Sequence, residues 1–97
     1  MTQKVIDKGG LEFELTDEIW HHIQESHPEI DSMEIVSTVL YDPDHIVRSN
    51  WESTSCLYYK REGKYYKVVV VNSEQKKIKT AYTTNTIKSG ESVWIKN

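Results

Sequence analysis

Hydrophobic and polar residues alternate over positions 11–15, directly after a Gly-Gly pair. Leu11, Phe13 and Leu15 are separated by single glutamates. Alternation with a period of two is typical of a strand that buries one face. The glycine pair breaks the chain just before this strand. We therefore expect residues 1–10 to be a loosely held N-terminal segment that precedes the first regular element.

Two helices are predicted next. Thr16 stands where a helix N-cap is expected, and the apolar residues that follow have helical spacing. This helix should end near His27, because the residue before a proline avoids the α conformation. A second helix is predicted to begin near Asp31, which has the spacing of a capping box with Glu34. The Tyr-Asp-Pro-Asp sequence at 41–44 then predicts a turn.

After this turn the hydrophobic period changes from about 3.6 residues to two. Strands are predicted over 45–49, 55–61, 64–72 and 77–84, with a short last strand over 93–96. Four consecutive valines at 68–71 are apolar on both faces, which predicts that their strand is central. The predicted fold is α+β, with one or two N-terminal helices packed on a four- to five-stranded antiparallel meander. A chain of 97 residues has the length of a single domain, residues 1–97.

The net charge of −3 hides an uneven distribution along the chain. Residues 1–44 carry two lysines against eleven acidic residues, a balance of −9. Residues 45–97 carry ten Lys or Arg against four acidic residues, a balance of +6. Such a division favours a basic face that binds an anion. Simple attraction between the two halves would explain the same division.

The composition argues against several kinds of site. A single cysteine, Cys56, allows no disulfide within the chain and no cysteine-based zinc site, and we expect it to be buried. The four histidines lack the i, i+4 spacing of a helical metal pair, so neither a metal nor another cofactor is predicted. No apolar run reaches the length of a membrane helix and the N-terminus lacks a signal-peptide core, so we expect cytoplasmic residence without membrane contact.

One face of the predicted sheet must cover the helices, and the other can carry cations, hydroxyls and aromatic rings. Alternation places Tyr58 and Lys60 together on one face of their strand. In the 77–84 strand, Thr80 and Tyr82 share a face, and Thr83 points to the other one. This set of groups suits a phosphodiester and a stacked base. A solvated face decorated with Lys and Tyr would need no ligand at all.

Two further side chains are candidates for chemistry. His27 ends a helix just before a proline, where an imidazole can point outward and act as an acid or base near neutral pH. It would equally serve as a C-terminal cap that offsets the helix dipole. Arg48 lies in the strand after the turn, where a guanidinium suits bidentate phosphate contact or an ion pair with the acidic helices.

Several short motifs follow one another in a recognisable order. They are HIQESHPE at 22–29, DPD-x-I at 42–46, YYK at 58–60, VVVV at 68–71 and KTAYTT at 79–84. Together they resemble the small nucleases of the phage-associated barnase–EndoU–colicin E5/D–RelE-like (BECR) superfamily, over roughly residues 15–94. The resemblance implies a RelE-like fold, RNA bound on the open sheet face, and metal-independent cleavage by attack of the ribose 2′-hydroxyl on the adjacent phosphate.

The resemblance also implies site residues. By position, the catalytic set is His27, Arg48, Thr80, Tyr82 and Thr83. Face parity, rather than any motif, adds Lys60, Lys67 and Tyr58 as substrate-binding residues.

Two functions therefore follow as expectations. The first is an endoribonuclease of toxin, phage or mobile-element context, with RNA as substrate and an antitoxin or immunity protein as a candidate partner. The alternative is a catalytically inactive module of the same fold that binds RNA or a protein partner through its basic sheet face. A purely structural role for the charge division is a third interpretation. The sequence leaves the RNA target and the oligomeric state open.

Overall fold

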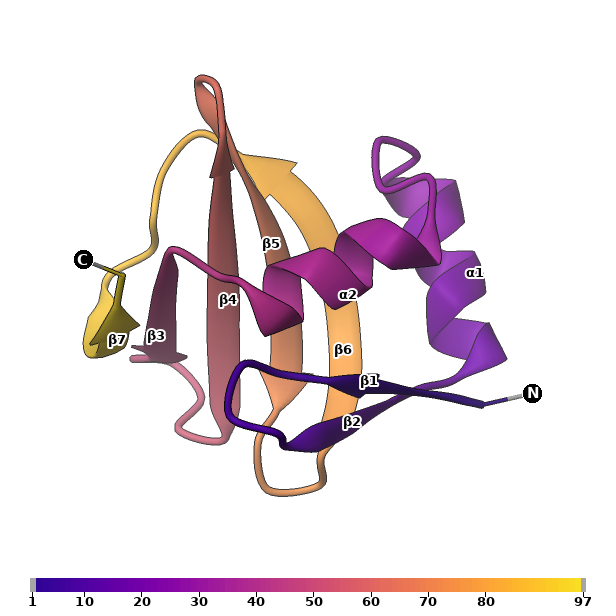
Figure 1. Ribbon diagram of the computed structural model, residues 1–97, viewed down its shortest axis with the longest axis horizontal. Coiled ribbons are helices and arrows are strands. Elements are labelled where there is room, and N and C mark those ends of the chain that lie inside the picture. Colours follow the sequence, from indigo (N-terminus) through magenta and orange to yellow (C-terminus); the bar gives the residue numbers. More distant parts are fainter. Residues whose placement is uncertain (1, 97) are drawn as a thin grey trace.

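The computed structural model describes residues 2–96, which form one seven-stranded sheet with two helices packed against it (Figure 1). The strands are β1 (Gln3–Ile6), β2 (Glu12–Leu15), β3 (His45–Ser49), β4 (Ser55–Glu62), β5 (Tyr65–Asn72), β6 (Lys77–Thr84) and β7 (Gly90–Ile95). The helices are α1 (Asp17–Ser26) and α2 (Met33–Tyr41). Across the sheet the order is β1-β2-β6-β5-β4-β3-β7, so β1 and β7 form the two edges.

The predicted sheet of four to five antiparallel strands is wrong. Strands β3 to β6 do form the expected antiparallel meander. Two additions make the sheet larger and mixed: a β1–β2 hairpin joins β6 through a parallel pair at Glu14 and Lys77, and β7 pairs with β3 at the opposite edge. Both additions depend on partners distant in sequence, which local hydrophobic alternation does not specify.

Part of the segment that was predicted to be loosely held forms the edge strand β1 of this sheet. Strand β1 pairs antiparallel with β2 over four residue pairs, and Val5 and Asp7 are buried. Met1, the first residue of the predicted loose segment, lies outside the described residues. A strand with a single buried aliphatic residue has almost no alternation signal, which is why the sequence did not predict it.

The first helix agrees with its prediction, and the second begins later. The Thr16 hydroxyl accepts the backbone N–H of Ile19 at 3.1 Å, which satisfies one free donor of the first turn of α1. Helix α2 begins at Met33 with Ser32 as its N-cap, and no side chain caps it. The predicted capping box that started at Asp31 is therefore wrong.

Each face of the sheet carries a hydrophobic cluster. The larger one lies between the helices and the sheet and includes Ile23, Val36 and Leu40 from the helices. The smaller one lies on the opposite face. It contains Val47, Leu57, Tyr59 and Val68, with Tyr66, Val70, Tyr82 and Ile87 packed against it. Ile87 belongs to the β6–β7 connection, so this connection covers part of the face that the sequence left open.

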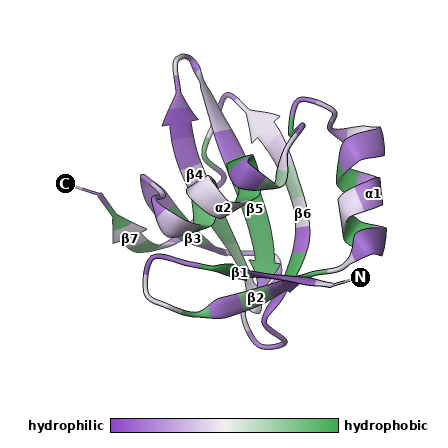
Figure 2. Cartoon of the chain, turned by 45° about the vertical axis from the view of Figure 1, so that its right-hand side comes forward, coloured by the Kyte–Doolittle hydropathy of each residue, from purple (hydrophilic) through white to green (hydrophobic). Residues whose placement is uncertain are grey.

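The central position predicted for the four valines is confirmed. Strand β5 lies between β4 and β6, and Val68, Val69 and Val71 are buried. Figure 2 shows this stretch of β5 as one of the most hydrophobic parts of the sheet. Cys56 on the neighbouring strand is buried as expected.

A buried carboxylate fastens the β1–β2 hairpin to the rest of the sheet. Asp7 is only 5% exposed, and its Oδ1 accepts the backbone N–H groups of Gly9 and Leu11, both at 2.9 Å. Its Oδ2 accepts the hydroxyl of Tyr58 at 2.8 Å. Burial, followed by the hydrogen bond and the charge of Asp7, raises the pKa of Tyr58 far above its usual range. The phenol therefore remains a donor in the folded protein.

We expect this tyrosine to make the domain sensitive to alkali. A pKa that is higher in the folded than in the unfolded state contributes stability that is complete below about pH 10 and declines as the pH rises above that value. Urea titrations between pH 8 and pH 11 should show the free energy of unfolding falling at the alkaline end. The decline should be smaller in Tyr58→Phe, which has no phenol to ionise. Equal slopes for both proteins would contradict the assignment.

Candidate functional site

A hollow lies on the sheet face that the helices do not cover. It is lined by Ser49, Trp51, Glu52, Ser55, Leu57, Val70, Lys79, Thr80, Tyr82 and Lys88, and has a volume of about 360 Å³. These residues come from the end of β3 and the β3–β4 connection, from β4, β5 and β6, and from the β6–β7 connection. We call this the sheet-face hollow. It combines an apolar floor with cations, hydroxyls and aromatic rings, which is the chemistry expected of a small-ligand site.

A lysine in the hollow is held by a carboxylate and a hydroxyl. Lys79 Nζ lies 2.8 Å from Glu52 Oε1 and 2.9 Å from Ser55 Oγ. The Ser55 hydroxyl in turn donates to Glu52 Oε1 at 3.1 Å. The hydrogen bonds from Lys79 and then from Ser55 lower the pKa of Glu52. Glu52 thus occupies the position on Lys79 that an oxyanion of a ligand would take.

Two hydroxyl-bearing residues of β6, Thr80 and Tyr82, line the same hollow. The Thr80 hydroxyl is buried and has no hydrogen-bond partner within residues 2–96. An unsatisfied buried hydroxyl costs about 1–3 kcal/mol, so its retention calls for an explanation such as a bound ligand atom. Burial, and to a lesser extent Tyr59, raises the pKa of Tyr82. The Tyr82 phenol is therefore a hydrogen-bond donor at physiological pH.

The segment after α1 runs along β6 and brings His27 to Tyr82. The ring centroids of His27 and Tyr82 are 5.7 Å apart, and the rings are tilted by 43°. Glu29 Oε2 accepts the backbone N–H of Thr83 at 3.1 Å and lies 3.9 Å from His27 Nδ1. This carboxylate both anchors the segment to β6 and faces the imidazole.

Glu29 is ionised under ordinary conditions. Partial burial raises its pKa, but hydrogen bonds from its own backbone N–H and from that of Thr83 outweigh burial, with His27 adding to them. The net pKa is lower than usual. Glu29 was not among the residues predicted from the sequence, although it belongs to the His-Pro-Glu motif.

The structure thus brings together four of the five predicted catalytic residues. His27 and Tyr82 are in ring contact, Thr83 is joined to them through Glu29, and Thr80 lines the hollow beside Tyr82. Arg48 does not join them. It pairs with Cys56 across the β3–β4 ladder and so lies on the helix-covered face.

Arg48 has a different environment. Its Nη1 lies 3.6 Å from Glu91 Oε1 on β7, and both side chains are largely exposed. It lines a separate hollow with Asp7, Tyr58 and Trp94. The ion pair expected as one alternative therefore exists, with a partner on the neighbouring strand rather than on a helix.

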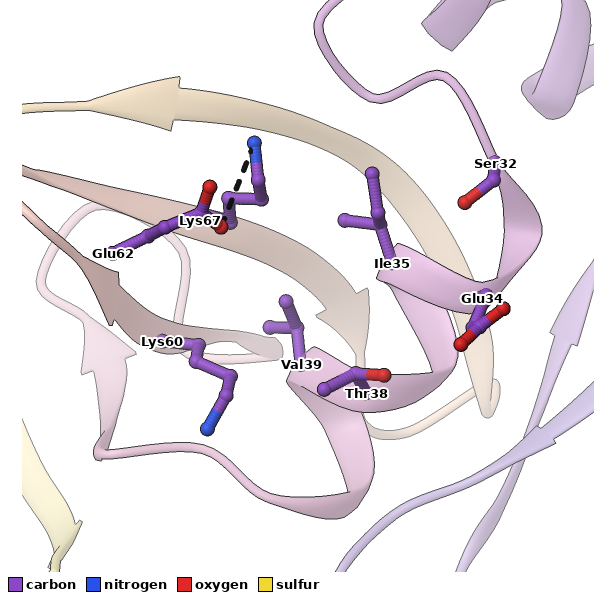
Figure 3. Close-up of a pocket in the computed structure, with 8 residues that line it drawn as sticks. All are labelled: Ser32, Glu34, Ile35, Thr38, Val39, Lys60, Glu62 and Lys67. Atoms are coloured by element: carbon purple, nitrogen blue, oxygen red, sulfur yellow. Dashed lines mark ion pairs between the residues drawn. The ribbon is translucent and has the colours of Figure 1, made fainter.

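The three residues added from face parity also lie on the helix side. Lys60 and Lys67 line a pocket between α2 and the β4–β5 hairpin, together with Ile35 and Val39 (Figure 3). Lys67 Nζ lies 4.0 Å from Glu62 Oε2. Tyr58 is buried against the hairpin of β1 and β2. Alternation had placed Tyr58 and Lys60 on one face correctly but did not reveal which face the helices cover.

Two lysines of the basic half of the chain form ion pairs with an aspartate of the acidic half. Lys60 Nζ donates to the Asp42 carboxylate at 3.0 Å, and Lys96 Nζ donates to it at 3.1 Å. Hydrogen bonds from Lys60 first, and then from Lys96, lower the pKa of Asp42. Attraction between the acidic and basic halves therefore accounts for these two lysines, whereas Lys79 and Lys88 remain at the hollow.

Sequence reasoning predicted only Thr80 and Tyr82 among the residues of the hollow, and missed both its lysines and its tryptophan. Lys79 and Lys88 line it, and Trp51 stands at its rim with 91% of its surface exposed. A tryptophan within an otherwise polar turn was the available signal, because aromatic side chains supply large contact areas at binding surfaces.

No protein-family model matches this chain, and no curated protein or solved structure is significantly similar to it. Within residues 2–96, no group of three or more His, Cys, Asp or Glu side chains is arranged to hold a metal ion. The two helices of that part of the chain are too short and too polar to cross a membrane.

Proposed function

We propose that this domain is an endoribonuclease that binds RNA over the sheet-face hollow and cleaves it without a metal ion. One observation carries the proposal: the His27 imidazole, faced by a carboxylate, lies against Tyr82, and Tyr82 lines the hollow together with two lysines and Thr80, whose hydroxyl is unsatisfied. The ordered motifs that resemble the BECR nucleases support the same chemistry.

The proposed reaction is an internal displacement at phosphorus. His27 takes the proton from the ribose 2′-hydroxyl while the 2′-oxygen forms a bond to phosphorus and the bond to the 5′-oxygen breaks. Tyr82 gives its proton to the leaving 5′-oxygen. The products are a 2′,3′-cyclic phosphate and a free 5′-hydroxyl, so no water is consumed in this step.

The remaining groups support the charge that develops. Lys79 and Lys88 supply positive charge to the phosphorane, and the Thr80 hydroxyl donates a hydrogen bond to one of its oxygens. Glu29 holds the imidazole and stabilises it once it is protonated. Thr83 acts through its backbone N–H, which positions Glu29. Arg48 has no part in this assignment, because it lies on the other face of the sheet.

The test of the proposed function is a cleavage assay with metals chelated. A mixed RNA pool is incubated with the purified domain in EDTA, and the new ends are scored for 2′,3′-cyclic phosphate. Cleavage that leaves cyclic ends is expected. If the purified domain cuts no RNA, with RNase inhibitor controlled for, the nuclease proposal is wrong.

A specific observation favours the second candidate, a module of the same fold that binds RNA without cutting it. Lys79 is already paired with Glu52, and Arg48 lies outside the hollow. RNA retention that weakens with salt, without cyclic ends, would support this candidate. Retention that does not depend on salt would point instead to a protein partner, such as an antitoxin or immunity protein. Either activity would take place in the cytoplasm, where Cys56 stays reduced.

Replacing Glu52 with glutamine should increase the affinity for RNA. The Glu52 carboxylate competes with phosphate for Lys79, and an exposed ion pair of this kind changes affinity by up to about fivefold. Fluorescence anisotropy with a 2′-O-methyl oligonucleotide, which cannot be cleaved, measures the change. Glu12→Gln makes the same change of charge on β2, far from the hollow, and should leave the affinity almost unaltered. Unchanged binding in Glu52→Gln would argue against Lys79 as a phosphate ligand.

Replacing Thr80 with valine should make the domain more stable and weaken its binding of RNA. Valine has nearly the same shape and removes the unsatisfied hydroxyl, so the free energy of unfolding should rise by about 1 kcal/mol. RNA binding should weaken at the same time, because a donor to the phosphate is lost. Urea denaturation and anisotropy measure the two effects. A variant that is less stable, or that binds RNA as the parent does, would contradict the role given to this hydroxyl.

A further inference from the structure

We infer that the ligand of the sheet-face hollow is an unpaired stretch of nucleic acid, one of whose bases stacks on the indole of Trp51. The inference rests on the proposed binding of RNA at this face, but not on cleavage. It names the substrate class and a residue that selects it.

Trp51 is exposed although its turn is well ordered by hydrogen bonds. The backbone N–H groups of Trp51 and Glu52 donate to Ser49 Oγ at 3.0 and 3.2 Å. The Glu52 side chain is fixed by Lys79 and Ser55, and the backbone N–H of Ser55 donates to the Glu52 carbonyl at 2.9 Å. The indole is thus presented to solvent by a structured turn, not by a dangling chain.

The other two tryptophans of the chain have a different environment. Trp20 and Trp94 are partly buried and pack against the main hydrophobic cluster, and Trp94 also lies under the ammonium of Lys8. Only Trp51 among the three has 91% of its surface in water. A single exposed aromatic residue is common in proteins, so its position next to the phosphate-binding groups is what gives it meaning.

The lysines that line the hollow with Trp51 indicate which kind of ligand binds beside its indole. Lys88 lines the hollow, its backbone N–H donates to the Tyr59 hydroxyl at 3.0 Å, and its ammonium has no ion-pair partner within the described residues 2–96. Lys79 lies on the same wall. A ligand that places an anion on these lysines and an aromatic ring on Trp51 has the make-up of a nucleotide in a polynucleotide chain.

Stacking on the indole requires a base with a free face. In an A-form duplex each base is covered by its neighbours above and below, so its faces are closed to an aromatic side chain. A looped-out or single-stranded base has no such cover. Stacking of one base on an aromatic side chain changes affinity by about five- to 150-fold.

The test compares one strand in its free and its duplex form. A fluorescein-labelled 2′-O-methyl oligonucleotide is titrated alone and after annealing to its complement, against the parent chain, Trp51→Ala and Trp51→Phe. The parent should bind the single strand at least about tenfold more tightly than the duplex. Trp51→Ala should lose about five- to 150-fold for the single strand only, and Trp51→Phe should retain much of the affinity. Quenching of the intrinsic tryptophan fluorescence by the bound strand should vanish in Trp51→Phe. It should persist in Trp20→Phe, a substitution in the hydrophobic cluster that serves as the matched aromatic control.

The outcomes separate this inference from the nuclease proposal. Because the probe has no free 2′-hydroxyl, binding does not depend on cleavage. If the strand binds through Trp51 and RNA is never cut, the inference stands and the nuclease proposal fails. If Trp51→Ala binds like the parent, if the duplex binds as tightly as the single strand, or if no strand binds at all, the inference is overturned. An unchanged melting temperature for Trp51→Ala, expected for so exposed a side chain, excludes unfolding as the cause of a loss.

Discussion

Replacing His27 with alanine is expected to lower the rate of RNA cleavage by about 10²- to 10⁴-fold, the usual contribution of a positioned acid or base. Histidine is the usual acid-base residue of enzymes, and the His27 imidazole contacts the Tyr82 ring and faces the Glu29 carboxylate. Single-turnover cleavage of a short RNA, followed by the appearance of the cyclic phosphate end, measures the loss.

The fold should survive this substitution. The part of residue 27 that closes α1 is its backbone N–H, which donates to the Ile23 carbonyl at 2.7 Å and remains in alanine. His21→Ala is the matched control, because His21 is an exposed histidine on the same helix. A variant at 27 that cuts RNA at the parental rate, or equal losses in both variants, would remove His27 from the mechanism.

Replacing Asp7 with alanine is expected to lower the free energy of unfolding by about 2–4 kcal/mol. The substitution leaves three donors without their acceptor, namely the backbone N–H groups of Gly9 and Leu11 and the buried hydroxyl of Tyr58. A buried donor without a partner costs about 1–3 kcal/mol, and water can reach the two partly buried backbone groups. For a domain of this size the melting temperature should fall by about 4–8 °C for each kcal/mol.

A double-mutant cycle shows whether the loss arises at this contact. Tyr58→Phe removes the hydroxyl, so the loss caused by Asp7→Ala should be smaller in that background. Asp31→Ala, at an exposed carboxylate, should change stability little. Additive losses in the cycle would mean that the hydroxyl and the carboxylate act independently and that the hairpin is held by other contacts.

The two edges of the sheet were harder to predict than its centre. Strands β3 to β6 alternate strongly and follow one another through short turns, so their pairing is local and visible in the sequence. Strand β7 pairs with β3, more than forty positions earlier in the chain. Near Gly90 the two strands approach so closely that an added Cβ would lie 2.6 Å from Val47 Cγ1. A need for glycine of this kind becomes visible only when the partner strand is known.

The candidate site, too, was predicted only in part from the sequence. The ordered motifs indicated His27 and Tyr82, which are in ring contact, although they lie on a helix end and a strand 55 positions apart. They also indicated Arg48, which lies on the opposite face. Alternation assigns residues to one of two faces, but a strand pattern with hydrophobic residues on both sides does not say which face the helices will cover. In the structure Lys60 lines the pocket next to α2 on the helix-covered face, whereas Lys79 lines the hollow on the other face.

The sequence by itself determined the helix-to-sheet order, the central meander and the concentration of cations in the second half of the chain. These features depend on local periodicity, turn residues and composition, which a short window contains. Only the tertiary structure decided which anion of the chain each cation meets and which cations line the hollow, because an ion pair such as Lys60 with Asp42 depends on packing between distant segments. The same packing left Trp51 in solvent beside Lys79 and Lys88, and so defined the surface on which the proposed function depends.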